Sequence, residues 1–248
     1  MVHLGSDSDF AVLAGSGITI AGAINSTTIT GDIGTFPTTS ITGLGNVVLN
    51  GVNHVGDAVT QNAKNDLVAA YNDAAGRAAD TTVAGGFDLA GQTLFSGVYS
   101  DASSLFLSGT LTLNAQGNPD AVWVFQAGST LITASNSTVD LINGAQACHV
   151  FWQVGSSATL GTGTDFVGNI LALSSITLNT GATVDGRVLA QNGAVTLDAN
   201  TRSVCSTGGS GGTGGATVPD RGSTLLLLVS GLATLFLFEC RFFSGSTA

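Results

Sequence analysis

The 248-residue chain is acidic, with a formal net charge of −10, yet only 9% of its residues are charged and 35 are glycine. Because ordinary globular domains carry roughly 25% charged residues, hydroxyl and amide groups must supply most of this surface. Six basic residues cannot neutralise a nucleic-acid backbone, so the composition excludes nucleic-acid binding. The length suits one all-β domain of about 200 residues and a tail.

The first strong pattern along the chain is helical and covers roughly residues 56–80. Asp57 stands at its start and Arg77 near its end, as the helix dipole favours. Small and apolar side chains recur at helical spacing between them: Val59, Ala63, Leu67, Ala70, Ala74 and Ala78. The sequence therefore predicts one long helix with a narrow apolar stripe.

A repeated pattern occupies the second half of the chain. Thr-Leu pairs recur at Thr130, Thr159, Thr177 and Thr196, in steps of 29, 18 and 19 residues, so one copy carries an insertion around residues 143–149. Periods near 20 residues with Gly, Asn and Ser corners are typical of solenoids, in which each coil stacks on the next. The sequence predicts a β-solenoid with three short strands in each coil.

Side chains alternate along each strand, so that Ile176 and Leu178 are predicted inside and Thr177 outside. One strand of each coil has two consecutive apolar residues, and one of these must face outward. We expect this outward column to consist of Phe125, Trp152, Leu171 and Leu189. An exposed apolar stripe of this size needs a cover, which the predicted helix can supply. Two open faces remain.

Two cysteines bracket the last coils. In an exported protein, Cys148 and Cys205 would form a disulfide worth about 2–4 kcal/mol, and the alternative is two buried thiols. The opening stretch "MVHLGSDSDF" has no charged-then-apolar signal pattern. We expect an export signal to have been removed or not included.

The C-terminal part differs in composition from residues 1–205. Residues 206–217 form a Gly/Ser-rich linker, and residues 218–248 contain an apolar run from 224 to 238. The layout "VPDRG", apolar run, basic end resembles the bacterial VPDSG/PEP-type sorting tail, although Arg221 replaces a small residue and Arg241 alone forms the basic end. We expect membrane contact only through this segment. The alternative is a terminal helix that packs on the solenoid.

Blocks along residues 10–205 carry a resemblance. In order they include "ITGDIGT", "VGDAVTQNAKNDLVAAYNDAAGR", "GTLTLNAQGNPDAVWVFQAGSTL" and "GNILALSSITLNTGATVDGRVLAQNGAVTLDANT". This series resembles the microbial ice-binding proteins that share the domain of unknown function 3494. The resemblance implies a right-handed, discontinuous β-solenoid of triangular section with a helix along one face, and adsorption to ice through a flat Thr-rich face. Ser96 stands where the family usually has proline.

The candidate ice-binding residues lie on the Thr-Leu strand and the corner after it. Stacked threonines would lie about 4.8 Å apart and be stiff at χ1, which pre-organises the array. The family's Thr-Ala/Gly-x-Thr/Asn corner matches at residues 133–136 and 180–183 and nearly matches at 162–165. The predicted set is Thr130, Thr133, Thr159, Thr162, Thr177, Thr180 and Thr196, with Thr164 and Thr183 at the edge. The other open face, with Thr138, Thr183 and Thr201, is the alternative site.

Other functions find less support in the sequence. Asp140, Asp165, Asp185 and Asp198 are scattered and lack the nonapeptide repeat of calcium-binding solenoids. His3, His54 and His149 form no zinc spacing or catalytic triad. We therefore expect a secreted or surface-held ice-binding protein that is not an enzyme, has no metal or cofactor, and is monomeric once the tail is removed. The alternative is a cell-surface adhesion or matrix solenoid that binds carbohydrate or protein.

Overall fold

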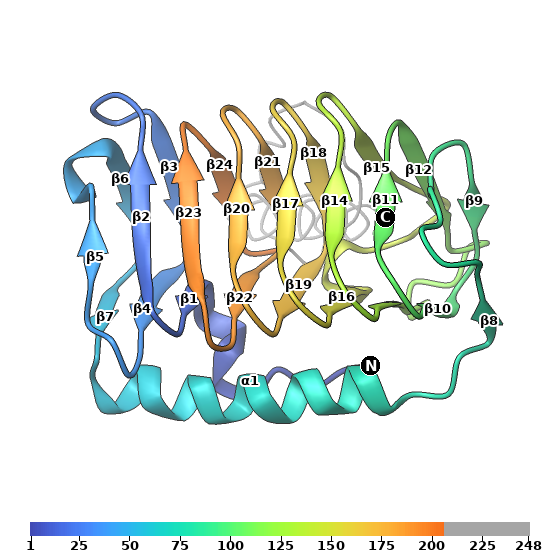
Figure 1. Cartoon of the computed structure of the whole chain (residues 1–248), viewed down its shortest axis with the longest axis horizontal. Helices are drawn as coiled ribbons and strands as arrows, with labels where there is room; N and C mark the ends of the chain where they lie inside the picture. The colour runs from blue at the N-terminus through green and yellow to red at the C-terminus, as the bar shows by residue number, and fades with distance from the viewer. Residues whose placement is uncertain (206–248) are drawn as a thin grey trace, which may run out of the picture. The chain divides into compact units, whose positions relative to one another are not determined.

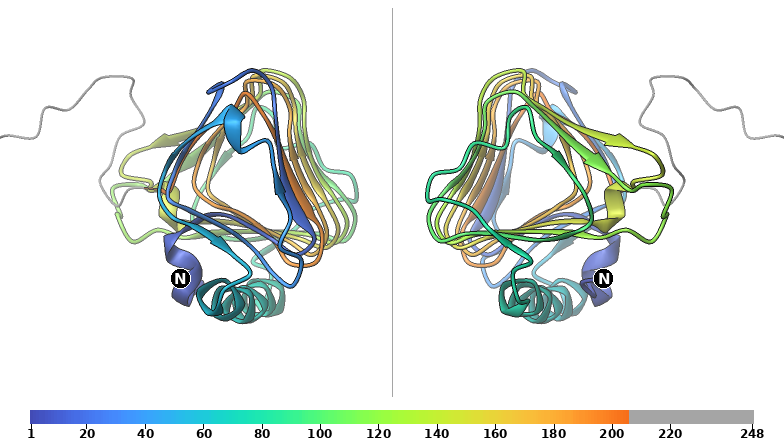
Figure 2. Two further views of the ribbon diagram at one scale, coloured as in Figure 1. Left: turned by 90° about the vertical axis from the view of Figure 1, so that its left-hand side faces the viewer. Right: turned by 90° about the vertical axis from the view of Figure 1, so that its right-hand side faces the viewer.

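The computed structural model describes residues 1–205, which form a triangular β-solenoid with one α-helix along one side (Figures 1 and 2). All strand pairs between neighbouring coils are parallel, and the strands build three sheets. This confirms the predicted fold class.

Sheet A lies beside the helix, sheet B faces the viewer in Figure 1, and sheet C closes the triangle. In spatial order, sheet A contains β7 (Asn53–Val55), β4 (Asp32–Thr35), β1 (Phe10–Ala14), β22 (Val188–Ala190), β19 (Asn169–Ala172), β16 (Val150–Val154), β13 (Trp123–Ala127), β10 (Gly97–Asp101) and β8 (Thr81–Thr82). Sheet B contains β11 (Leu105–Leu107), β14 (Leu131–Thr133), β17 (Ala158–Leu160), β20 (Ile176–Leu178), β23 (Ala194–Asp198), β2 (Gly17–Ala21) and β5 (Ile41–Thr42). Sheet C contains β6 (Val47–Asn50), β3 (Thr27–Thr30), β24 (Thr201–Ser203), β21 (Thr183–Asp185), β18 (Asp165–Val167), β15 (Thr138–Ile142), β12 (Thr110–Asn114) and β9 (Thr93–Leu94).

The coils do not stack in sequence order. The first strands of the chain pair with the last ones, so that Val12 is opposite Val188, Thr19 opposite Thr196 and Thr28 opposite Thr201. The chain then crosses to the other end of the solenoid through helix α1 (Ala58–Gly76), as Figure 1 shows, and builds back toward its own start. Residues far apart in the sequence therefore share one face.

Helix α1 covers the outer side of sheet A, as predicted. It is shorter than the predicted range, and two residues of the predicted stripe are not part of the buried one: Val59 is exposed, and Ala78 lies beyond the end of the helix. Its stripe Ala63, Leu67, Ala70 and Ala74 is buried against Phe10, Leu13, Val124, Phe151, Leu171 and Leu189. The Asp57 side chain accepts a hydrogen bond from the Thr60 backbone N–H at 2.8 Å and caps the first turn.

The predicted outward column was wrong at two of its four positions. Phe125 and Trp152 point into the core, where their rings stack with centroids 4.1 Å apart, and Val124 and Phe151 lie under the helix instead. Strand pairing explains the error, because Trp152 is opposite the inward Ile170 and not opposite Leu171. A slip of one residue in a strand exchanges the two faces.

Two buried basic side chains form hydrogen bonds that join the helix and the N-terminal segment to sheet A. Lys64 Nζ donates to the Ala190 carbonyl at 2.8 Å, and Arg187 Nε donates to the Ser8 carbonyl at 3.0 Å. Burial lowers the pKa of Lys64 to about 8 and raises the pKa of the buried Asp7 nearby to about 8. Since Arg202 is also buried, the exposed surface of residues 1–205 has very few cationic groups.

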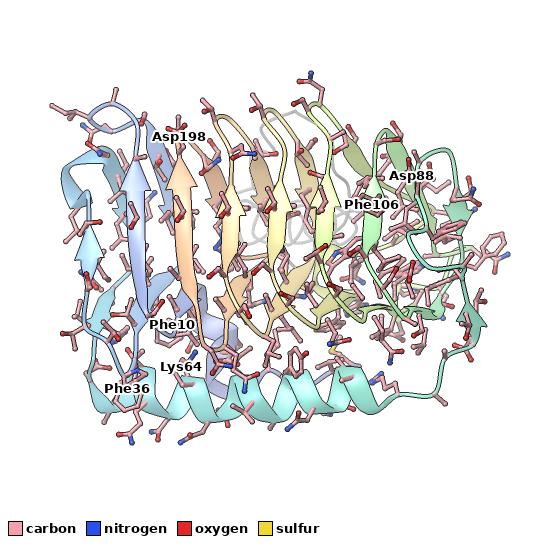
Figure 3. All side chains as sticks on the ribbon, in the orientation of Figure 1. Phe10, Phe36, Lys64, Asp88, Phe106 and Asp198 are labelled. Atoms are coloured by element: carbon pink, nitrogen blue, oxygen red, sulfur yellow. A yellow bond between two sulfur atoms is a disulfide. The ribbon has the colours of Figure 1, made fainter. Side chains whose placement is uncertain are left out.

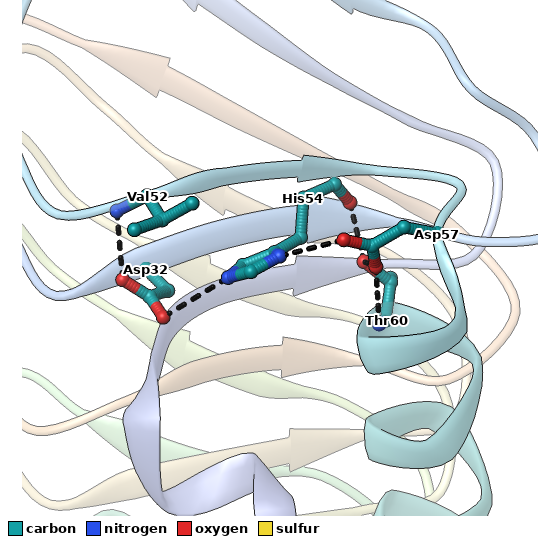
Figure 4. Close-up of polar contacts among 5 residues, drawn as sticks. All are labelled: Asp32, Val52, His54, Asp57 and Thr60. Atoms are coloured by element: carbon teal, nitrogen blue, oxygen red, sulfur yellow. Dashed lines mark hydrogen bonds and ion pairs between the residues drawn. The ribbon is translucent and has the colours of Figure 1, made fainter.

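A hydrogen-bonded group joins the end coil to the start of α1 (Figure 4). The His54 ring lies between two carboxylates, with Nδ1 2.7 Å from Asp57 and Nε2 3.3 Å from Asp32. Asp32 also accepts from the Val52 backbone N–H at 2.7 Å. Although partial burial alone would lower it, the two carboxylates raise the pKa of His54.

Candidate functional site

Sheet B carries a column of five threonines in register. Thr42 is opposite Thr19, Thr19 opposite Thr196, Thr196 opposite Thr177, and Thr177 opposite Thr159. We call this column the threonine ladder. It continues onto Ile132 and Phe106, which occupy the same position on β14 and β11. Figure 3 labels Phe106 near one end of sheet B. Backbone pairing fixes the spacing of the ladder at about 4.8 Å per strand.

The hydroxyls of the threonine ladder are available to solvent. Thr42 Oγ1 donates weakly to Thr19 Oγ1 at 3.4 Å, and within residues 1–205 the hydroxyls of Thr159, Thr177 and Thr196 have no hydrogen-bond partner. These threonines nevertheless belong to paired strands that pack on the core, and β-branched side chains have few rotamers, so the array is stiff. The ladder is thus a regular surface of methyl and hydroxyl groups.

Charge is sparse on this sheet, although Asp88, labelled in Figure 3, is bridged to Phe106 beyond β11. In the seven strands of sheet B, Asp198 is the one ionisable residue, and it lies at the end of β23 where it accepts a hydrogen bond from the Thr180 hydroxyl. The location of Asp198 at the top of the sheet can be followed in Figure 3. A neutral surface does not impose an ionic hydration shell on the water above it.

Sheet C also has outward threonines, but acidic residues interrupt them. Asp165 lies between Thr138 and Thr183 in one column and accepts a hydrogen bond from the Thr183 hydroxyl at 2.7 Å. Asp185 lies on the same sheet, and burial raises the pKa of its carboxyl.

The loops after β12 and β15 also set sheet C apart from sheet B. They project from the solenoid on that side, as Figure 2 shows, and pair with each other through a hydrogen bond from the Gln146 side chain to the Pro119 carbonyl at 2.7 Å. Sheet B is therefore flatter and less charged than sheet C.

Comparison with known proteins agrees with this arrangement. A model of the family described as Ice-binding-like matches residues 12–203. The chain belongs to this family. An ice-binding protein of Nostoc sp. (strain HG1) is 48% identical over 245 residues, which cover 98% of this chain and 88% of that protein. An ice-binding protein of Colwellia sp. is 39% identical over 214 residues, covering 81% of this chain and 82% of the relative.

Solved structures of ice-binding proteins have the same fold. The crystal structure of an ice-binding protein from an Antarctic biological consortium superposes with a TM-score of 0.79 at 47% identity and covers 83% of this chain and 91% of that one. The ice-binding protein of the Antarctic ascomycete Antarctomyces psychrotrophicus also has a TM-score of 0.79, at 42% identity, with 83% and 98% of the two chains covered.

The structure places three of the predicted residues, Thr159, Thr177 and Thr196, in the threonine ladder. Thr130 lies beside the ladder, where its hydroxyl is 2.8 Å from that of Ser104. The alignment of Thr130 with Thr159 was wrong by two residues, since Leu131 is opposite Ala158 and Ile132 takes the ladder position. A slip of two keeps the inward and outward alternation, so the sequence pattern could not reveal it.

Two predicted residues cannot belong to an exposed face. Thr133 is 4% exposed and Thr164 is fully buried, because both turn inward where sheet B meets sheet C. Thr162 and Thr180 are exposed at this corner, whereas Thr183 lies on sheet C.

Thr19 and Thr42 lie in the ladder but outside the Thr-Leu repeat from which the site was predicted. Both follow an isoleucine in a short Ile-Thr strand, which was a usable signal, but these strands join the ladder only through the non-sequential stacking.

The remaining expectations concern cysteines, metals and the tail. A disulfide joins Cys148 and Cys205, whose Cα atoms are 5.2 Å apart. In the part of the chain that the structure describes, no group of three or more His, Cys, Asp or Glu side chains could hold a metal ion. No helix within residues 1–205 is long and apolar enough to cross a membrane. The predicted linker and sorting segment, residues 206–248, lie outside the described residues.

Proposed function

We propose that this protein adsorbs to ice through the threonine ladder of sheet B. The observation that carries the proposal is the register of Thr42, Thr19, Thr196, Thr177 and Thr159 on five neighbouring strands. A lattice of methyls and hydroxyls with fixed spacing can hold water in a repeating array that merges with the ice surface.

The packing beneath the ladder favours this function. Binding costs less when the groups are already held in their bound arrangement, and β-branched side chains on paired strands lose little freedom on adsorption. The inward side chains between the ladder threonines, such as Ile18, Val195 and Leu197, are completely or almost completely buried. Sheet B therefore presents a rigid surface and needs no rearrangement to meet a crystal.

The test is to place a bulky side chain in the middle of the ladder. Thr177→Tyr should remove most ice-growth inhibition while leaving the melting temperature nearly unchanged, since the side chain is on the surface. The matched control is Thr201→Tyr on sheet C, which should keep the activity. Loss of activity in Thr201→Tyr with retention in Thr177→Tyr would move the site to sheet C. Retention in both variants would place the site outside both columns. Failure of the unaltered protein to inhibit ice growth or to partition into growing ice would favour the adhesion function.

We also propose that residues 218–248 only locate the protein, at the membrane or cell surface, and that residues 1–205 are exported, monomeric and not enzymatic. The apolar run of residues 224–238 behind a Gly/Ser-rich stretch supports this proposal. Deleting residues 206–248 should move the protein from the membrane fraction to the medium, with ice activity and melting temperature unchanged. A truncated protein that unfolds or loses activity would contradict it.

A further inference from the structure

One inward position of sheet B breaks the pattern of its column. The corresponding residues on the other strands are all apolar: Leu107, Leu160, Leu178, Leu197 and Ile20. On β14 the column holds Thr133, which is opposite Leu107 and buried. A hydroxyl in a leucine column costs free energy unless it is hydrogen-bonded.

The Thr133 hydroxyl belongs to a short buried chain of hydrogen bonds between two coils. Thr133 Oγ1 accepts from the Gly161 backbone N–H at 2.9 Å, and it lies 2.9 Å from Thr164 Oγ1. Thr164 Oγ1 in turn donates to the Ala134 carbonyl at 3.1 Å. Because each hydroxyl has one proton and Thr164 donates to Ala134, Thr133 is the donor to Thr164. The buried Ser137 hydroxyl, 3.3 Å from Thr164 Oγ1, also donates to the Ala134 carbonyl at 2.9 Å. The chain runs from Gly161 N–H to the Ala134 carbonyl with both hydroxyls satisfied.

This chain stands where the backbone ladder of sheet B stops early. Pairing between β11 and β14 reaches Leu107 and Thr133, and pairing between β17 and β20 reaches Leu160 and Leu178. Between β14 and β17 it ends at Ile132 and Thr159, one residue sooner. The Thr133 side chain gives the next amide, that of Gly161, an acceptor.

We propose that Thr133 and Thr164 are positioning residues of the ice-binding face. Neither touches the surface, but together they hold the end of β14 against β17 and thereby keep Ile132 and Thr159 in one plane. The proposal rests on the function proposed above for sheet B. Without the two hydroxyls, Gly161 N–H loses its buried acceptor and the strands separate at this corner.

The test removes the hydroxyl and keeps the shape. Thr133→Val should raise the hydrogen-exchange rate of the Gly161 amide about tenfold and lower ice-growth inhibition measured just below 0 °C. Thr164→Val leaves Thr133 as the acceptor of the Gly161 N–H but removes the partner of the Thr133 hydroxyl, so it should give smaller changes of the same sign. Thr133→Ser keeps the hydroxyl and should restore slow exchange and activity.

The control is Val139→Ala, which truncates a buried side chain on β15 of sheet C. It should lower the melting temperature, as Thr133→Val does, yet retain activity near 0 °C, where both variants are folded. Full activity in Thr133→Val, beside an inactive Thr177→Tyr, would overturn the positioning role and leave the proposed function intact. Full activity in Thr177→Tyr would instead overturn the proposed face. Equal activity losses in Val139→Ala and Thr133→Val would reduce the role of Thr133 to general stability.

Discussion

Sheets B and C each carry an outward column of threonines over the same core, yet the two columns differ in what their hydroxyls do. On sheet B the hydroxyls of Thr159, Thr177 and Thr196 have no partner within residues 1–205, whereas on sheet C the Thr183 hydroxyl is bound to Asp165. Under the function proposed above, a threonine repeat is not sufficient for an ice-binding surface. The proposal also requires hydroxyls that are free to bind water, with few carboxylates interrupting their column.

Sheet A differs from sheets B and C because helix α1 covers its outer side. Disrupting the contact between α1 and sheet A should reduce stability more than any other change proposed here. Leu67→Asp would bury an unpaired carboxylate between α1 and sheet A, where Leu67 is fully buried. We expect the free energy of unfolding to fall by about 4 kcal/mol. Chemical denaturation measures this loss. Val68→Asp, on the solvent side of the same helix, is the control and should change stability by less than about 0.5 kcal/mol. Equal losses would mean that α1 is not the cover.

An acidic residue placed in the ladder would make sheet B resemble sheet C. Thr196→Asp puts a carboxylate between Thr19 and Thr177, whose hydroxyls can donate to it as Thr183 donates to Asp165. We expect a loss of more than about tenfold in ice-growth inhibition, with a melting-temperature change of only a few degrees. The reverse change on sheet C, Asp165→Thr, should leave the activity of the protein unaltered. Full activity in Thr196→Asp would show that charge does not separate the two faces.

Adding a threonine to the ladder should change ice-growth inhibition less than placing a carboxylate in it. Ile132→Thr adds a sixth threonine next to Thr159 and should raise ice-growth inhibition by less than about twofold, since one group is added to five. Ile132→Val, which shortens the side chain without adding a hydroxyl, is the control and should give no gain. A gain in both variants would assign the effect to side-chain size.

The end coil, formed by β5, β6 and β7, contributes one strand to each open face. Its contribution to the free energy of unfolding should depend weakly on pH. The pKa of His54 is raised in the folded protein by Asp57 and Asp32, so the stabilisation is complete below the unfolded pKa and is lost as pH rises through the folded one. We expect the free energy of unfolding to change by less than about 1 kcal/mol over the neutral range, because His54 and its two carboxylate partners are partly solvated. His54→Gln should flatten this part of the stability profile, which thermal melts across pH 5–9, roughly, can follow. An unchanged slope would exclude His54 as its source.

The spacing of residues within single segments was sufficient to predict much of the structure. The helical spacing around Leu67 and the Thr-Leu repeat at Thr159, Thr177 and Thr196 predicted the cover and the centre of the ladder. What local pattern could not supply was register. The insertion before β16 allowed Thr130 to be aligned two residues away from its true partner, and alternation is blind to such a shift. The hydrogen-bond partner of the buried Thr133 hydroxyl is Gly161, a residue of another coil, which the local pattern around Thr133 does not indicate.

Stacking the first strands on the last ones has a consequence for how the protein is made. Thr19 and Thr196 are neighbours in the sheet although they lie 177 residues apart in the chain. Closing so large a loop is slow compared with forming contacts between successive coils. As the chain leaves the ribosome, the segment before α1 must wait until the last coil has been synthesised. A nascent chain that lacks its last coil would therefore have only part of the ladder.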